Sequence, residues 1–269
     1  MAADPMVEEA AGRAFGDLAA KWHAGAMRRE ELVRRIEALG FGAALPSWPD
    51  AAAILRAQAR SAAPVDMALL LVTRDPAAAI AYDPECYDGG GAAPRLQAPA
   101  AAALALGRLL QVTGALEAAL ELSLGYVQER RQFGRPLAKF QAIQHQLAVA
   151  AEEIAACTVA ADLALACAAS EGVGSARAAR LLDCATLVAN RAVDVAYDAC
   201  HQVHGAMGFT REYALHRHSL DLLRWRDELL ALRGGELAAA ERLGGAALEA
   251  GGAWRTVTAL MTPEREKGS

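Results

Sequence analysis

Four long stretches with helical periodicity, separated by short glycine-containing corners, constrain the fold of this chain more than any other feature. Alanine and leucine, which both favour helices, dominate the sequence, whereas aromatic residues make up only 5% of it. We therefore predict a mainly α fold built on an antiparallel four-helix bundle. The four stretches cover approximately residues 100–131, 140–170, 175–204 and 213–242.

The residues before the bundle divide into a short helical segment and a linker. Residues 1–72 show helical patterns, although the apolar run at 67–72 fits a strand as well as a helix. Residues 73–99 contain four prolines and a triple glycine, a composition typical of linkers. The predicted organisation is therefore a helical segment (1–72), a linker (73–99), the bundle (100–244) and a mobile tail (245–269).

Charge and cysteine usage argue against several classes of protein. The net charge is -5, and the basic residues are scattered among acids, so we expect neither nucleic acid nor an anionic membrane as a partner. The start of the chain lacks the pattern of a secretory signal, and we expect no later segment to stay apolar for the width of a bilayer. The five widely spaced cysteines predict buried thiols in a reducing compartment, and so a cytoplasmic protein.

The first corner, residues 129–136, reads Glu-Arg-Arg-Gln-Phe-Gly-Arg-Pro. Guanidinium groups suit a pyrophosphate, an aromatic ring suits an adenine, and Gly134 lets the chain turn sharply. Taken alone, these residues are explained as well by arginines that complement a helix C-terminus, with Phe133 covering the end of the bundle.

Together with a second corner at 202–209, which reads Gln-Val-His-Gly-Ala-Met-Gly-Phe, this pattern resembles the C-terminal domain of the flavin-dependent acyl-CoA dehydrogenases. The resemblance covers about residues 100–226 and implies FAD as the cofactor, with its adenosine diphosphate half held from a neighbouring subunit. Ala206 departs from the pattern, because the family has a second glycine there. The cofactor-binding residues that the resemblance implies are Arg130, Gln132, Phe133, Gln202 and Gly205.

The resemblance also implies that parts of the family's active site are missing. Family members carry a β-domain before the bundle, and residues 73–99 are too few to form one, which indicates a shortened member. In the family a glutamate removes the α-proton of a thioester, but its two usual positions fall on Gly107 and Leu229. Glu228 adjoins the second position and is the candidate catalytic base, although it fits a solvated residue paired with Arg224 somewhat better.

The histidines do not form a recognisable metal site in the sequence. His201 and His204 lie three residues apart and fit one face of a helix, but no third ligand has suitable spacing. His216 and His218 are two residues apart, so they point in different directions on a helix. We therefore predict no metal.

Three functions follow from this pattern. In the first, the chain is the small subunit of an FAD-dependent acyl-CoA dehydrogenase and supplies the adenosine clamp to a larger homologue, in a heterotetramer of lipid or steroid catabolism. In the second, it is a homo-oligomeric dehydrogenase that uses Glu228. In the third, it is a flavin-free scaffold. Bound flavin distinguishes the first two from the third, and a co-purifying homologue distinguishes the first from the second.

Overall fold

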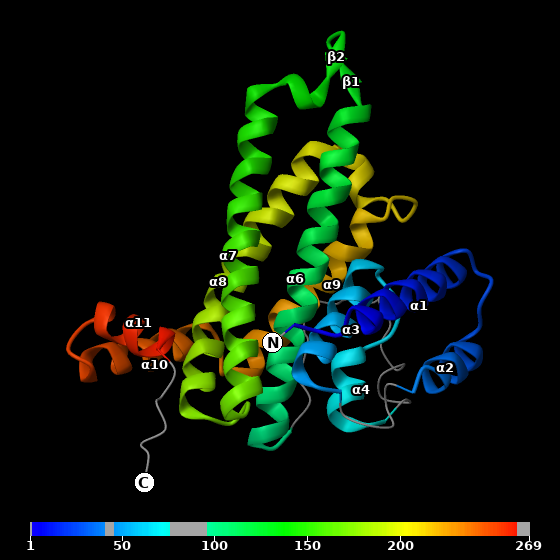
Figure 1. The fold of residues 1–269 in the computed structure, drawn as a ribbon. Coiled ribbons are helices and arrows are strands. Elements are labelled where there is room, and N and C mark those ends of the chain that lie inside the picture. The colour runs from blue at the N-terminus through cyan, green and yellow to red at the C-terminus, as the bar shows by residue number, and fades with distance from the viewer. Residues whose placement is uncertain (1, 41–45, 76–95, 263–269) are drawn as a thin grey trace.

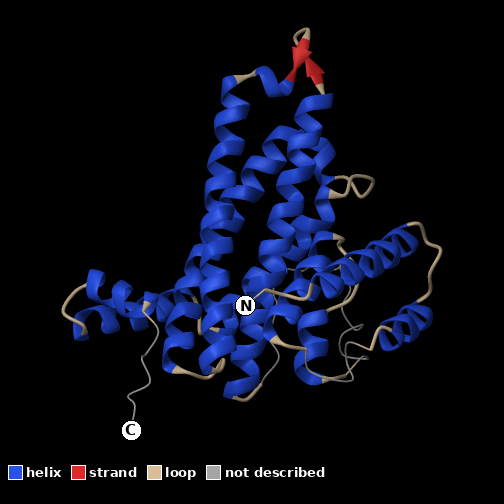
Figure 2. Cartoon of the chain, viewed as in Figure 1, coloured by secondary structure: helices blue, strands red, loops and turns tan. Residues whose placement is uncertain are grey.

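The computed structural model describes residues 2–40, 46–75 and 96–262 (Figure 1). Helices make up nearly all of this described part, and a two-stranded hairpin at one end of the molecule is its only sheet (Figure 2). The prediction of a mainly α protein is therefore confirmed. The predicted linker at 73–99 lies largely outside the described residues.

Four helices form the bundle: α6 (Ala98–Glu129), α7 (Gln141–Glu171), α8 (Ala176–His204) and α9 (Leu215–Leu232). The central helix, α6, packs against the other three, and α7 runs along α8. The fourth helix ends earlier than the sequence pattern predicted, because Gly234 and Gly235 adopt positive φ angles of 80° and 92° and turn the chain. Figure 1 shows α6 and α7 rising together to the hairpin.

In the described residues ahead of the bundle there are four shorter helices: α1 (Pro5–His23), α2 (Arg29–Ala38), α3 (Trp48–Arg60) and α4 (Met67–Thr73). The apolar run that fitted a strand or a helix is helix α4, and the side chain of Asp66 caps its first turn. Helices α3 and α4 both pack on α6. Gly114 permits the close approach of α3, because a Cβ atom at this position would lie 2.7 Å from the carbonyl oxygen of Arg56.

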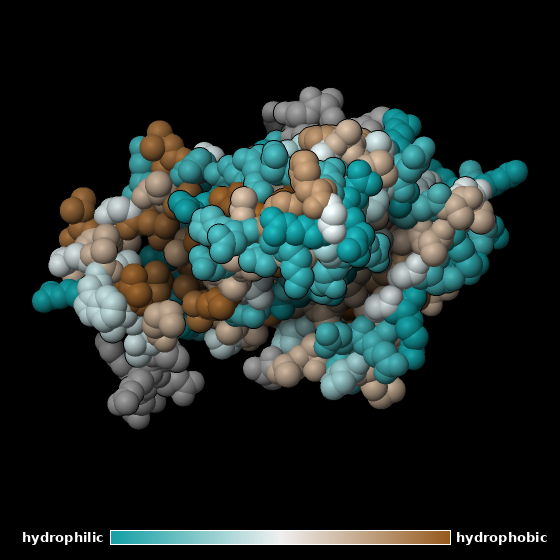
Figure 3. Space-filling model, turned by 90° about the horizontal axis from the view of Figure 1, so that it is seen from above, coloured by the Kyte–Doolittle hydropathy of each residue, from teal (hydrophilic) through white to brown (hydrophobic). Residues whose placement is uncertain are grey.

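Much of the segment after Gly244, which was predicted to be a tail, is helical. Helix α10 (Glu236–Glu249) and helix α11 (Ala253–Met261) form a hairpin that stands beside the bundle (Figure 1). Asp183 of α8, whose side chain is 2% exposed, accepts hydrogen bonds from Arg233 and Arg242 and so ties α10 to the bundle. Hydrophobic residues gather on this side of the molecule (Figure 3), and Trp254 on α11 is 80% exposed.

Within the described part of the chain, two helices are long and apolar enough to cross a membrane by length and composition alone, contrary to the expectation that no segment would be. In α6, 83% of the most apolar window is buried, which is the pattern of a core helix. In α7 the buried share is 33%. Many of the small, apolar side chains of α7 are therefore left uncovered in this chain.

The cysteines follow the prediction in part. Cys157, Cys167 and Cys200 are buried free thiols, and burial raises the pKa of the Cys157 thiol to about 12. Cys184 is exposed, so the prediction of a buried thiol is wrong there. Cys86 lies outside the described residues.

Candidate functional site

The first corner is a tight β-hairpin at the end of the bundle. Strand β1 (Arg131–Gln132) pairs with β2 (Arg135–Pro136), and the two residues between them, Phe133 and Gly134, adopt φ angles of 51° and 78°. Two consecutive positive φ angles are typical of the hairpin turn that matches strand twist, but a bulky residue in this region is strained. The ring of Phe133 is nevertheless 90% exposed, so packing within the chain does not compensate for the strain. An exposed aromatic residue in a strained conformation points to a role in binding.

The second corner follows α8 directly. Gly205 ends the helix with a φ angle of 60°, and residues Gly205–Phe209 continue as a 3₁₀ turn, η2. Gly208 is packed tightly, because a Cβ atom there would lie 3.0 Å from Nδ1 of His201. Gln202, Gly205 and Ala206 are exposed at the surface of this corner.

The bundle brings together the helix ends that lead into the two corners, although these ends are far apart in the sequence. The ring of Tyr126, near the end of α6, stacks on His204 at the end of α8 with 4.3 Å between centroids. One residue from each of α6, α7 and α8 joins a small buried apolar cluster of Val127, Leu147 and Val203. The chain therefore enters both corners from one packed platform of three helices, which fixes the position of one corner relative to the other.

The two histidines of the second corner are part of this platform. Nε2 of His201 lies 2.6 Å from the hydroxyl of Ser219, and Nδ1 of His204 donates to the carbonyl oxygen of Cys200 at 2.8 Å. Burial lowers the pKa of both imidazoles, and the neighbouring His204 lowers that of His201 further. Within the described ranges, no group of three His, Cys, Asp or Glu side chains is arranged to hold a metal ion.

The residues predicted to bind the cofactor are all exposed. No carboxylate among the described residues pairs with Arg130, so its guanidinium group remains available to a phosphate. The exposed ring of Phe133 and the exposed amides of Gln132 and Gln202 match what an adenosine needs, namely a flat apolar face and hydrogen-bonding groups. The two corners therefore fit the adenosine diphosphate half of a dinucleotide.

The candidate base, Glu228, is held in a buried ion pair. Its side chain is 12% exposed, and its Oε2 atom accepts from Nε and Nη2 of Arg108 at 2.7 and 2.6 Å. The expectation of a solvated Glu228 is therefore wrong. Burial raises the pKa of Glu228, while Arg108 opposes that shift. With Oε2 already bound to a guanidinium group, Glu228 is poorly placed to accept a proton from a substrate.

The two positions at which the family carries its base are also closed. A Cβ atom on Gly107 would lie 2.9 Å from Cβ of Ala68 on α4, so even a methyl group does not fit there without a shift. Leu229 is 1% exposed and belongs to the hydrophobic core. Neither position opens onto a space for an acyl group.

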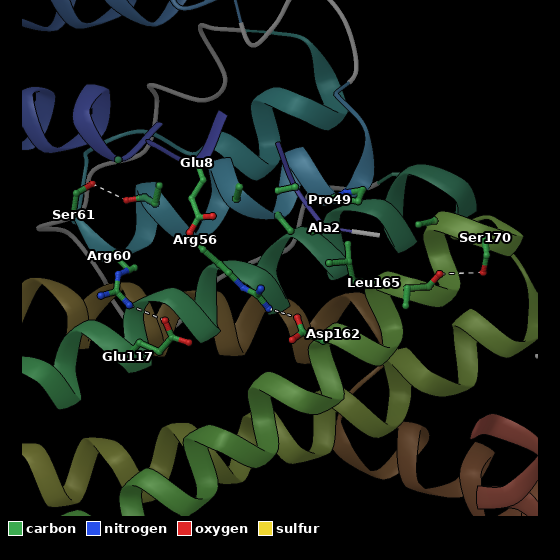
Figure 4. Close-up of a pocket in the computed structure, with 17 residues that line it drawn as sticks. Ala2, Glu8, Pro49, Arg56, Arg60, Ser61, Glu117, Asp162, Leu165 and Ser170 are labelled. Carbon is green, nitrogen blue, oxygen red and sulfur yellow. Dashed lines mark hydrogen bonds and ion pairs between the residues drawn. The ribbon is translucent and has the colours of Figure 1, made fainter. Parts of the chain in front are cut away.

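A cavity of about 1200 Å³ lies between α1 and α3 on one side and α6 and α7 on the other (Figure 4). Its lining is rich in alanine. Two arginines of α3 cross it: Arg56 forms an ion pair with Asp162 at 2.6 Å, and Arg60 forms one with Glu117 at 2.7 Å. Glu8 adds a further negative charge to the lining. Because carboxylates outnumber arginines here, the cavity offers no net positive charge to the phosphates of an acyl-CoA.

Two features of these regions were missed in the sequence. One is the buried Arg108. Its signal in the sequence was a single arginine within an apolar helical run, and its partner Asp66 lies directly before α4. The other is the contact of Arg135 and Phe133 with the ring of Phe140, which only the folded hairpin brings together.

The helical bundle is similar to known proteins. Residues 98–226 match the family model described as "Acyl-CoA dehydrogenase, C-terminal domain". The Bacillus subtilis protein YngJ, described as a probable acyl-CoA dehydrogenase, is 35% identical over 114 residues, which cover 39% of this chain and 26% of that protein. Across the curated relatives, the matched part covers between 26% and 30% of the relative.

Two solved structures share the fold over nearly their whole length. One is a chain of the Tcur3481–Tcur3483 steroid ACAD, with a TM-score of 0.68 and 20% identity over 91% of this chain and 98% of that one. The other is a chain of the ChsE4–ChsE5 complex from Mycobacterium tuberculosis, with a TM-score of 0.70 and 15% identity over 90% of this chain and 96% of that one. At these identities the likeness extends to the fold alone.

Proposed function

Because the chain belongs to the acyl-CoA dehydrogenase family through its helical bundle, we propose that it is the small subunit of an FAD-dependent acyl-CoA dehydrogenase. In this role it supplies the adenosine clamp for a cofactor whose flavin ring lies on a larger homologous subunit. Bound FAD would supply the acceptor for the electrons released when an acyl-CoA gains an α,β double bond.

The observation that carries the proposal is the joining of two exposed corners on one buried platform. Tyr126 and His204 hold the ends of α6 and α8 together, and the candidate cofactor-binding residues beyond them are exposed. Arg130 would contact the pyrophosphate, Phe133 would cover the adenine, and Gln202 would bind at its edge. Among the described residues, no acid pairs with Arg130, and Phe133 stays 90% exposed beside the ring of Phe140, which is consistent with a ligand that arrives on another subunit.

A catalytic site shared between two subunits would account for the lack of a suitable base in this chain. Gly107 and Leu229 cannot abstract a proton, and Glu228 is bound to Arg108, so the catalytic base would come from the larger subunit. Two of the solved structures that share this fold, Tcur3481–Tcur3483 and ChsE4–ChsE5, are each named as a pair of chains. A heterotetramer built from two such pairs would contain one active site per pair. The substrate class that we propose is a bulky acyl-CoA of lipid or steroid catabolism, in the cytoplasm.

The test is recovery of the tagged chain from its source cells, followed by identification of the co-purifying proteins and measurement of bound flavin. We expect a larger acyl-CoA dehydrogenase homologue and FAD in the same complex. Arg130→Ala should weaken FAD binding by about 10- to 150-fold, since a charge-assisted hydrogen bond contributes roughly 1.5–3 kcal/mol.

The matched control is Arg13→Ala, which removes an exposed arginine on α1 that forms an ion pair with Glu9. It should leave flavin content unchanged. A complex that holds no flavin, or an Arg130→Ala variant with full flavin occupancy, would refute the proposal.

A further inference from the structure

The hairpin of the first corner carries two more arginines, and its register places them on opposite faces. Gln132 pairs with Arg135, and Arg131 pairs with Pro136. Directly opposed residues of an antiparallel pair point to the same side, and successive residues along a strand alternate sides. Arg135 therefore shares a face with Gln132, whereas Arg131 lies on the other face.

The ring of Phe140 holds Arg135 in position. The guanidinium carbon of Arg135 lies 4.1 Å from the centroid of this ring, well inside the range of about 6 Å for a cation–π contact. No carboxylate among the described residues pairs with Arg135, unlike the arginines that pair with acids elsewhere on the bundle, such as Arg191 and Arg226. Its guanidinium group is therefore oriented by an aromatic face and still free to bind an anion.

The same ring also contacts Phe133. The two phenylalanine rings meet edge to face, with 6.2 Å between centroids and planes at 71°. Phe140 is the N-cap residue of helix α7 and is partly buried, and its carbonyl oxygen accepts a hydrogen bond from the backbone N–H of Gln144 in the first turn of that helix. The ring of Phe140 thus contacts both the exposed ring of Phe133 and the guanidinium group of Arg135.

Resting on the proposed function, we propose that Arg135 is a second phosphate-binding cation of the first corner, positioned by Phe140, and that Arg131 has no part in binding. The arginines of this corner therefore contribute unequally to binding. The face shared by Gln132 and Arg135 binds the dinucleotide, and the face of Arg131 does not.

The experiment measures the binding of ADP and of adenosine to the purified full chain by calorimetry. Arg135→Ala should weaken ADP binding about tenfold and leave adenosine binding within twofold, because it removes a charge contact and leaves the adenine contacts intact. It should also make the affinity for ADP less dependent on salt concentration. Arg131→Ala is the matched control and should change neither affinity by more than about twofold.

Phe140 is tested separately as a positioning residue. Phe140→Leu should reduce the affinity for both ligands. Phe140→Tyr, which keeps the ring, should bind both with the affinity of the wild type. Equal effects of Arg135→Ala and Arg131→Ala would overturn the inference, as would Arg135→Ala weakening ADP and adenosine equally. If Arg130→Ala then still reduces ADP binding, the proposed function stands and only the role of Arg135 falls. If the wild-type chain binds no ADP, the role of Arg135 falls, whereas the proposed function is decided by the flavin content of the purified complex.

Discussion

Replacing Arg108 with methionine should destabilise the protein more than any surface substitution, because this arginine neutralises two buried carboxylates. Arg108 is 1% exposed and contacts both oxygens of Asp66, Oε2 of Glu228 and the amide oxygen of Gln111. These partners come from three separate elements, so the network ties the segment before the bundle to α6 and α9. Attraction to both acids outweighs burial and raises the pKa of Arg108 above its usual value, so the guanidinium group stays charged.

The expected loss follows from the charges left behind. Asp66 is 4% exposed and the Glu228 side chain 12%, so removing the guanidinium group leaves two acids without their cation in a poorly solvated region. Breaking a buried pair in this way typically costs about 3–5 kcal/mol. For a chain of this size, such a loss corresponds to a melting temperature lower by roughly 6–20 °C.

The assay is urea unfolding of the wild type and of Arg108→Met at neutral pH. The control is Arg13→Met, which removes an exposed ion pair and should cost less than about 0.5 kcal/mol. Adding Asp66→Asn and Glu228→Gln to Arg108→Met should recover part of the loss, because no uncompensated charge then stays buried. A loss below about 1 kcal/mol in Arg108→Met, or no recovery in the triple variant, would refute this account.

Three further predictions concern packing, pH and the C-terminal hairpin. Gly114→Ala should destabilise the protein by about 1–3 kcal/mol in urea unfolding because its Cβ atom would meet α3, whereas Gly125→Ala, at an open site of the same helix, should be neutral or stabilising. Burial lowers the pKa of His218 to about 4, so the stability that it provides is complete above about pH 6.5 and is lost by about 3 kcal/mol as the pH falls towards 4. His218→Gln should flatten that part of the stability–pH curve, and an unchanged curve would contradict the assignment. Asp183→Ala should speed amide hydrogen exchange in α10 before it affects the bundle core, and uniform loss of protection would count against a local anchor.

The bundle was predictable because its determinants are local and periodic. Long runs of alanine and leucine favour helices, and the glycine corners limit where those helices end. The segment at 67–72 was ambiguous for the same reason, since six apolar residues fit either regular structure. Its helical state follows from burial against α6 together with the cap from Asp66.

The exposed residues of the two corners were also identifiable, because a basic and aromatic turn between two helices is visible in the chain itself. Their proximity was not, since it depends on how α6 and α8 pack. The surroundings of Glu228 were misjudged because its partner, Arg108, is distant in the sequence and meets it only in the folded state.

The sequence by itself determined the helices, their breaks and the chemical character of the two corners, because each depends on neighbouring residues and their spacing. Only the tertiary structure decided which charges neutralise one another and which remain free to bind a ligand. Glu228 forms an internal ion pair with Arg108, whereas no carboxylate in the described part of the chain pairs with the exposed Arg130 or Arg135. The physical reason is that the strength of an ion pair depends on distance and burial, and both are set by packing between elements that are remote in the chain.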